Sequence, residues 1–494
     1  MCVLAIDAGT SMIKTVLYAE DGTELAVARQ GTKVHRPHSG WAEQDMMDVW
    51  NAVVYTVRQA RSHAPGPVRM VTFTAQGDGC WLVDEAGNPT GPAVLWSDGR
   101  AKDVVERWRA DGILDEAFQS NGSYTFPGLP NAILTWFAEN DPDRLARSRT
   151  ALYCGGWLFS RMTGEFATEE SDASSPFLDP GSRTYSPHIQ KLFGFEHLSR
   201  FLPPIRSDDR RVGELTREAA AELGLPAGTP AVMGPYDIAA TAIGAGAVTP
   251  GQACTILGTT LCTEVVRDKV NTSGEPSGST IAFGSGGNVL RAYPTLAGTE
   301  VLTWASGMLG LNSVRDLGDL AASADIGAGG ITFLPYLSPA GERAPFLDPN
   351  ARGTVWGLSL EHTRAQVARA VFEGLSMVIE DCLAAAGSTA TELSVCGGGS
   401  NSEFWCQLIA DVTGLPVARS TDAEIGAKGA FLTGLVATGA EQSLVTAAGR
   451  YVTERRRFSP DPETARYYTD HYHEFLSLCS IAQHGWNRQG ASRG

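Results

Sequence analysis

Residues 3–11 read VLAIDAGTS, an apolar strand that runs directly into a glycine turn. Residues 15–18 are again strand-like, and the Asp-Gly pair at 21–22 favours a tight reversal into a third strand. Asp45 can then cap a helix that continues to about residue 61. The chain is therefore predicted to begin with strands around a glycine turn, followed by a helix.

The turn has a clear use in phosphate chemistry. Glycine lets the backbone come close, exposed N–H groups face the anion, and the hydroxyls of Thr10 and Ser11 add donors. Asp7, at the strand end, can hold Mg²⁺ through water, and Lys14 on the next strand can meet phosphate charge. Taken alone, a tight hairpin is the simpler interpretation of such a turn.

The second half of the chain repeats this plan. Residues 253–257 form a predicted strand, residues 258–260 a Gly-Thr-Thr turn, and residues 261–266 the returning strand. We therefore expect a duplicated α/β unit that faces itself across a cleft. Gly258 and Thr259 would then clasp a triphosphate from the side opposite the first turn.

The length of 494 residues exceeds one typical core, and domains of roughly 100–250 residues predict two. The small-residue stretch 243–251 favours a boundary there. We expect an N-terminal domain at residues 1–247 and a C-terminal domain at residues 248–494.

Composition excludes several classes of protein. The net charge of −16 argues against a chain built to bind nucleic acid. The first residues lack the basic start of a signal peptide, and no run of eighteen apolar residues predicts a membrane span. The nine cysteines are scattered without Cys-x-x-Cys spacing, so a reducing cytoplasm is the expected location.

Asp237 is the predicted general base. It follows a strand-like segment at 230–232 and opens a run of small residues at 238–242. A carboxylate at a strand end can accept the proton of a substrate hydroxyl, and phosphoryl transfer asks little more than such a base, positioning and charge neutralisation. The alternative is a helix N-cap, and both roles can hold together.

A glycine triplet at 397–399 separates a predicted strand from a predicted amphipathic helix at about 402–413. Glycines allow a flat adenosine to lie on the backbone, and a helix N-terminus favours phosphate. The triplet by itself is a weak motif, and its place after the second turn gives it weight.

Taken together, the chain resembles the FGGY carbohydrate kinases over nearly its whole length. The most specific element is GTVWGL at 353–358, followed by QVARAVFE at 366–373. Further matching elements are residues 7–14, 40–45, 95–100 and 397–401. The resemblance implies a two-domain actin-like (ribonuclease-H-like) ATPase fold with ATP and substrate in the interdomain cleft.

The resemblance also implies roles for residues. The N-terminal domain would bind mainly the sugar and the C-terminal domain mainly ATP. The expected assignments are Asp237 as base; Gln76, Asp78, Trp96 and Asp237 for substrate; Thr10, Ser11, Lys14, Gly258, Thr259, Gly398, Gly399 and Asn401 for nucleotide; and Asp7 beside Mg²⁺. Trp356 and Glu373, although part of the signature, are expected to be structural.

Departures from the family pattern bear on the substrate. Gly77-Asp78 replaces the Arg-Glu pair of glycerol kinases, and Asp78 stands where D-xylulose kinases typically carry histidine. Residues 76–82 and 335–346 are similar to erythritol kinases, whereas 39–45 and 97–100 are similar to xylulose and L-xylulose or keto-gulonate kinases. Ile133 stands where a lysine is usual.

We therefore expect ATP-dependent phosphorylation of a small sugar or polyol, either a pentulose such as xylulose or a tetritol such as erythritol. Asp78 accepts hydroxyl hydrogen bonds and would repel an acidic sugar. The alternatives are a nucleotide-dependent binding protein on the actin-like fold and a catalytically silent sugar sensor. A homodimer is among the expected assemblies.

Overall fold

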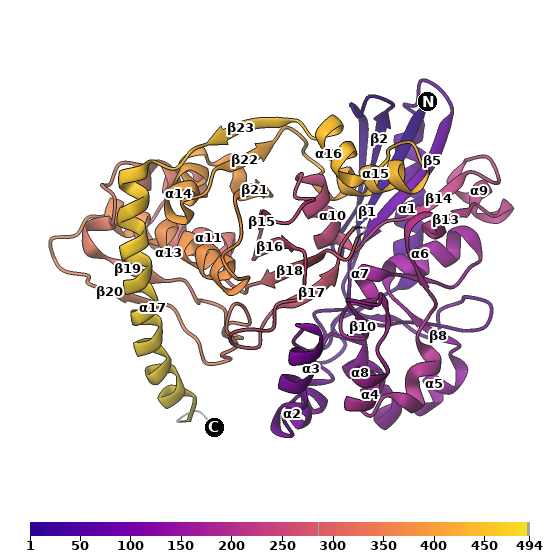
Figure 1. Ribbon diagram of the computed structural model, residues 1–494, viewed down its shortest axis with the longest axis horizontal. Helices are drawn as coiled ribbons and strands as arrows, with labels where there is room; N and C mark the ends of the chain where they lie inside the picture. The colour runs from indigo at the N-terminus through magenta and orange to yellow at the C-terminus, as the bar shows by residue number, and fades with distance from the viewer. Residues whose placement is uncertain (285, 492–494) are drawn as a thin grey trace.

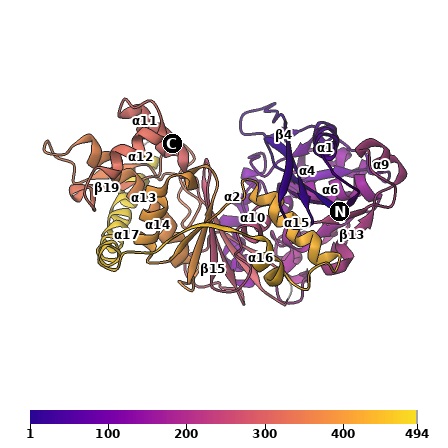
Figure 2. The same cartoon turned by 90° about the horizontal axis from the view of Figure 1, so that it is seen from above.

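The computed structural model describes residues 1–284 and 286–491 as two lobes, each built on a central sheet (Figures 1 and 2). The first sheet has the order β13-β14-β5-β1-β2-β3, and the second has the order β17-β18-β16-β15-β21-β22-β23. The strands of the first are β1 (Cys2–Ala8), β2 (Met12–Ala19), β3 (Glu24–Gly31), β5 (Val68–Ala75), β13 (Val212–Glu214) and β14 (Pro230–Met233). Those of the second are β15 (Gln252–Leu257), β16 (Leu261–Arg267), β17 (Ser279–Ala282), β18 (Val289–Pro294), β21 (Glu392–Cys396), β22 (Val417–Ser420) and β23 (Glu454–Phe458).

The two sheets repeat one topology. In each, the central strand (β1 or β15) runs antiparallel to the next strand and parallel to the strand on its other side. The neighbours further out also match in direction, and β17 is an addition to the second sheet. The predicted duplication is confirmed, and the arrangement is the two-domain actin-like α/β fold.

Helices pack against both sheets or form a separate cluster within the first lobe. In the first half they are α1 (Met46–Arg61), α2 (Lys102–Ala110), α3 (Ile113–Asn121), α4 (Pro130–Asn140), α5 (Pro142–Arg147), α6 (Cys154–Thr163), α7 (Glu170–Ala173), α8 (Pro187–Leu192), α9 (Arg217–Leu223) and α10 (Asp237–Gly244). In the second half they are α11 (Thr299–Met308), α12 (Val314–Ala322), α13 (Arg364–Ala385), α14 (Glu403–Thr413), α15 (Ile425–Ala437), α16 (Leu444–Tyr451) and α17 (Pro462–Ala491). Short strand pairs complete the fold: β4 (Glu43–Gln44) with β7 (Ala93–Val94), β6 (Trp81–Val83) with β8 (Thr150–Leu152), β9 (Thr168–Glu169) with β12 (Ile205–Arg206), β10 (Leu178–Asp179) with β11 (Thr184–Tyr185), and β19 (Thr332–Leu334) with β20 (Thr354–Trp356).

The continuous apolar run of β1 is explained by burial on both faces. Alternate side chains of a strand point to opposite faces. Leu4 and Ile6 lie in the core that contains Trp50 of α1, whereas Val3 and Ala5 lie in the core that contains residues of α15. As predicted, α1 begins after Asp45, whose carboxylate accepts hydrogen bonds from the first-turn N–H groups.

Helix α15 comes late in the chain but packs against the first sheet. The ring of Phe431 stacks on Tyr18 of β2 with centroids 4.6 Å apart, and Thr72 Oγ1 of β5 donates to the carbonyl of Ala430 at 2.8 Å. Gly429 of α15 lies so close to α10 that an added Cβ would be 1.8 Å from the carbonyl oxygen of Ala240. The pair α10 and α15 therefore joins the two lobes (Figure 2).

The signature residue Glu373 has a structural place, as predicted. Its Oε1 accepts hydrogen bonds from Tyr468 Oη at 2.6 Å, Arg369 Nε at 2.8 Å and the N–H of Gly327 at 3.0 Å. Because Tyr468 belongs to α17, this carboxylate fastens the C-terminal helix to α13.

No helix within the described ranges is long and apolar enough to cross a membrane.

Candidate active site

Asp7 and Lys14 face each other across the first glycine turn. Lys14 Nζ lies 3.7 Å from Asp7 Oδ2 and 2.9 Å from Glu424 Oε2, which precedes α15. Burial raises the pKa of Asp7, and the charge of Glu424 raises it further, while Lys14 opposes this shift. The structure therefore brings together a cation and two carboxylates at the end of β1.

The start of α15 closes over Asp7. A Cβ added at Gly426 would lie 3.1 Å from Asp7 Oδ2, so only a residue without a side chain fits there comfortably. This contact places the first turn of a helix beside the carboxylate. Sequence patterns gave no signal for Glu424 or Gly426, since both contacts join segments from opposite halves of the chain.

Three predicted site residues form one hydrogen-bonded chain. Trp96 Nε1 donates to Thr10 Oγ1 at 3.1 Å, and that hydroxyl donates to Gln76 Oε1 at 2.7 Å. Gln76 Nε2 donates in turn to Gln44 Oε1 at 2.8 Å, and Gln44 Nε2 donates to the carbonyl of Thr10 at 3.0 Å. Thr10 is thus tied to the residues expected on the substrate side, while the adjacent Ser11 is exposed.

The turn at residues 77–79 presents Asp78. A Cβ at Gly77 would lie 2.1 Å from Cδ2 of Tyr236, so the tyrosine ring fills the space of a residue-77 side chain. Asp78 has φ 54°, and Gly79 has φ 72° with no room for a Cβ beside the carbonyl of Val94. These contacts explain why small residues flank the aspartate in this chain.

Asp78 shares its surroundings with Arg343, which comes from the second lobe. Burial raises the pKa of Asp78 to about 7, and the charge of Arg343 opposes that shift. The Arg343 guanidinium lies 5.8 Å from the ring centroid of Trp96, and its Nε donates to the carbonyl of Pro294 at 2.8 Å. Arg343 was not among the predicted site residues, although it lies within a segment with family resemblance.

Asp237 is the first residue of α10, and Tyr236 is the N-cap. The Asp237 side chain is therefore not the N-cap: its Oδ1 accepts a hydrogen bond from the adjacent N–H of Ile238 at 2.8 Å. Burial raises the pKa of Asp237 to about 7, and the charges of Asp7 and Asp78 raise it too. The carboxyl is poised between its two protonation states near neutral pH.

In the second lobe, the turn at Gly258 lies beside the glycine triplet. Cβ atoms built at Gly397 and Gly399 would lie 2.9 Å and 3.2 Å from the carbonyl oxygen of Leu257. Gly258 accepts a hydrogen bond from the N–H of Thr299 at 3.0 Å. Two turns from separate strand ends therefore form one glycine-rich surface.

The outer part of this surface is open. A Cβ at Gly398 would meet nothing within 4 Å, and the Asn401 amide donates to the carbonyl of Gly398 at 3.2 Å. Thr259 and Asn401 are exposed. Among the described residues, no hydrogen bond or ion pair joins this group to the first glycine turn.

Two segments with family resemblance fold onto each other beside the substrate-side group. Arg100 Nε donates to Asp98 Oδ1 at 2.9 Å, and Arg100 also pairs with Glu43 at 2.6 Å. The guanidinium lies 3.9 Å from the ring centroid of Trp41. This network holds residues 40–45 against residues 97–100 and so helps to position Gln44, which bonds Gln76 and the carbonyl of Thr10.

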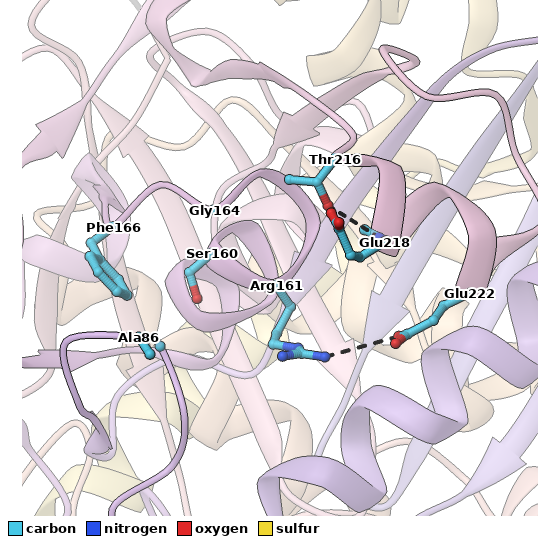
Figure 3. A pocket seen from close by; sticks show the side chains of 10 residues that line it. Ala86, Ser160, Arg161, Gly164, Phe166, Thr216, Glu218 and Glu222 are labelled. Carbon is cyan, nitrogen blue, oxygen red and sulfur yellow. Dashed lines mark hydrogen bonds and ion pairs between the residues drawn. The ribbon is translucent and has the colours of Figure 1, made fainter.

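A separate cavity of about 180 Å³ lies between α6 and α9 of the first lobe (Figure 3). Arg161, Ser160, Thr216 and Glu222 line it, and Arg161 pairs with Glu222 at 4.0 Å. It contains none of the predicted site residues. Within the described ranges, no group of three or more His, Cys, Asp and Glu side chains is arranged to hold a metal ion.

Comparison with known proteins identifies relatives that match nearly the whole chain. Residues 2–244 match the N-terminal domain of the FGGY family of carbohydrate kinases, and residues 225–438 match its C-terminal domain. An erythritol kinase from Brucella abortus (strain 2308) is 32% identical over 483 residues, covering 94% of this chain and 92% of the relative. An L-xylulose/3-keto-L-gulonate kinase from Escherichia coli (strain K12) is 29% identical over 493 residues, covering 97% of each.

The fold is also that of solved sugar kinases. The crystal structure of a ligand-bound xylulose kinase from Lactobacillus acidophilus superposes with a TM-score of 0.92 at 22% identity, covering 99% of each chain. Members of the matched family are carbohydrate kinases that use ATP as phosphate donor. The two family domains together span most of the sequence, and the chain belongs to the FGGY family of carbohydrate kinases.

Proposed function

We propose that this chain transfers the γ-phosphoryl group of ATP to a hydroxyl of a small neutral sugar or polyol, with Asp237 as general base. The observation that carries the proposal is the position of Asp237 at the start of α10, where the charges of Asp7 and Asp78 both act on it. A pKa of about 7 suits a base that must take a proton near neutral pH.

In this mechanism Asp237 accepts the hydroxyl proton while the hydroxyl oxygen forms a bond to the γ-phosphorus and the bond to ADP breaks. Gln76, Asp78 and Trp96 orient the acceptor. Thr10 links Gln76 to Trp96, so the first glycine turn and the acceptor site form one unit. Arg343 reaches this unit from the other lobe and places a cation beside Asp78.

The residues present fit Mg-ATP. Magnesium keeps most of its water and takes one or two carboxylates plus phosphate oxygens, so the partly exposed carboxylate of Asp7 suits it. Ser11 and Lys14 would meet phosphate from the first lobe. Gly258, Thr259, Gly398, Gly399 and Asn401 would border the nucleotide from the second lobe, where the open space above Gly398 accommodates a flat base. The metal would supply neutralisation of phosphate charge.

The acceptor is proposed to be a pentulose such as xylulose or a tetritol such as erythritol. Asp78 has no hydrogen-bond partner among the described residues, so its oxygens are free to accept substrate hydroxyls. An acidic sugar would place a third carboxylate beside those of Asp78 and Asp237. Relatives named erythritol kinase and L-xylulose/3-keto-L-gulonate kinase are the reason that both a tetritol and a pentulose are in the proposal.

A panel of tetritols, pentitols, pentuloses and keto-gulonate, assayed for ADP release with Mg-ATP, tests the proposal. Wild-type protein is expected to turn over a neutral acceptor, and the Asp237→Asn variant is expected to lose about 10²–10⁴-fold in kcat. Acceptor binding without ADP release would support the silent sensor instead. The boundary between residues 247 and 248, a homodimeric assembly and a cytoplasmic location stay predictions.

A further inference from the structure

Asp172, in α7, is a buried carboxyl without a partner. The residue is 3% exposed, and within the described ranges no hydrogen bond or ion pair reaches either carboxyl oxygen. Oδ1 is fully enclosed, whereas Oδ2 is not. Buried polar side chains nearly always have a hydrogen-bond partner, so an isolated carboxyl of this kind calls for an explanation.

The surroundings of Asp172 are those of the proposed acceptor site. Burial raises its pKa well above the ordinary value, and the charges of Glu169, Asp78 and Asp237 raise it further. A Cβ added at Gly155 would lie 3.4 Å from Asp172 Oδ2 and 3.8 Å from Cβ of Ala75. The carboxyl therefore lies over the start of α6 at the end of β5, the strand that leads into Gln76.

A second buried oxygen without a hydrogen-bond partner lies near Asp172. Tyr153, which precedes α6, is 2% exposed, and its Oη is enclosed without a hydrogen-bond partner. Burial raises the pKa of this phenol, and the charges of Tyr185, Asp172 and Asp78 contribute. Because the Tyr153 oxygen and Asp172 Oδ1 are both enclosed, Asp172 Oδ2 is the oxygen of this group that a ligand hydroxyl can reach.

The residues next to Asp172 in the sequence are well hydrogen-bonded. The neighbouring Ser171 donates from its N–H to Glu169 Oε2 at 2.6 Å, and its Oγ accepts from the N–H of Tyr236 at 3.0 Å. Glu169 pairs with Arg211 at 2.8 Å. The segment that carries Asp172 is thus fixed to the residue next to Asp237, and the missing partner is confined to one side chain.

We propose that Asp172 is a substrate-binding residue whose carboxyl holds a hydroxyl group of the acceptor. The inference rests on the proposed kinase function and deepens it. The acceptor then meets three carboxyl groups, those of Asp78, Asp172 and Asp237. Three carboxyl groups suit a substrate that carries several hydroxyl groups and no carboxylate of its own. This favours neutral polyols and ketoses over sugar acids as the acceptor.

The test compares Asp172→Asn and Asp172→Ala with wild type. We expect KM for the acceptor, and its Kd by calorimetry without nucleotide, to rise about 10- to 100-fold, because a hydrogen bond to the substrate is lost. KM for ATP is expected to stay unchanged. The melting temperature is expected to hold or rise, since the change removes an unpartnered buried carboxyl.

Asp411→Asn is the matched control. Asp411 is 8% exposed, but its Oδ1 accepts from Gln407 Nε2 and from the N–H of Asp461, both at 2.9 Å. Its replacement is expected to lower the melting temperature and to leave acceptor KM unchanged. Deoxy analogues of the best acceptor allow a double-mutant cycle between protein and substrate. Asp172→Asn should have little effect on the KM of the analogue that lacks the hydroxyl bound by Asp172.

The outcomes separate the two proposals. Wild-type acceptor affinity in Asp172→Asn, or equal losses for every deoxy analogue, would overturn the role of Asp172 while kinase activity stands. Acceptor binding that weakens in Asp172→Asn, in a protein that releases no ADP, would support Asp172 and overturn the kinase proposal. If wild type binds no member of the panel, both proposals fail.

Discussion

Lys14 Nζ lies 2.9 Å from Glu424 Oε2, so the cation expected to meet phosphate is held by a carboxylate from the other half of the chain. The same carboxylate pairs with Arg29 from β3. Glu424 therefore holds two cations at the edge of the proposed nucleotide site. A phosphate group that enters this site competes with Glu424 for Lys14.

The first prediction concerns that competition. Lys14→Ala is expected to lower kcat/KM for ATP about 10- to 100-fold, because a charge-assisted contact to phosphate is lost. Acceptor Kd, measured without nucleotide, should not change. Arg29→Ala is the control, since Arg29 shares Glu424 but is half exposed, and we expect less than about a threefold effect. Equal effects of both variants would contradict a direct role for Lys14.

The second prediction is a pH profile. Since the pKa of Asp237 is about 7, the carboxyl gains its base form as the pH rises from 6 to 8. We expect kcat/KM for the acceptor to rise about tenfold per pH unit below the pKa and to level off above it. Asp237→Asn should retain only a weak, flat profile. A wild-type profile without this acid limb would remove Asp237 as the base.

The third prediction concerns stability. Burial raises the pKa of Asp78 to about 7 in the folded chain, so between pH 4 and 7 the folded state holds a proton that the unfolded chain releases. The stability that this proton contributes is complete below about pH 4 and is lost as the pH rises through 7. Asp78→Asn should therefore raise the melting temperature more at pH 8 than at pH 5. An equal change at both values would contradict the shifted pKa.

The fourth prediction follows from the contact of Gly77 with Tyr236. Because an added Cβ would lie 2.1 Å from the Tyr236 ring, Gly77→Ala should displace either the ring or the turn that carries Asp78. We expect acceptor KM to rise about tenfold or more, together with a loss of about 1–3 kcal/mol in the free energy of unfolding. Gly307→Ala in α11 serves as the control, since a Cβ there would meet nothing within 4 Å and Gly307 has no place in the proposed site. Unchanged acceptor KM in Gly77→Ala would show that the turn adapts.

The sequence predicted the fold well because its main signals are local. The strand and turn at residues 3–11, its counterpart at residues 253–260 and the Asp45 cap each depend on neighbours in the chain. Asp237 at the start of a helix was also a local signal, although its exact place after the N-cap was not.

The parts that the sequence did not predict depend on contacts between distant segments. Glu424 and Arg343 reach the first lobe from the second, and no periodicity marks a charged loop residue as part of a site. Asp172 looks like an ordinary polar residue in a polar stretch until its burial and lack of a partner are known. In the sequence Gly77 looks like a flexible turn residue. In the structure a glycine is required there because the Tyr236 ring fills the space of a side chain.

The placement of α15 sets an order on biosynthesis. One face of the first sheet, with Val3, Ala5 and Met70, is covered by a helix that ends at Ala437. A ribosome that has made only the first half has exposed that face but has not yet produced its cover. We expect the nascent first lobe to stay partly folded and to depend on chaperones until α15 emerges from the ribosome. We also expect a fragment of residues 1–247, expressed alone, to aggregate.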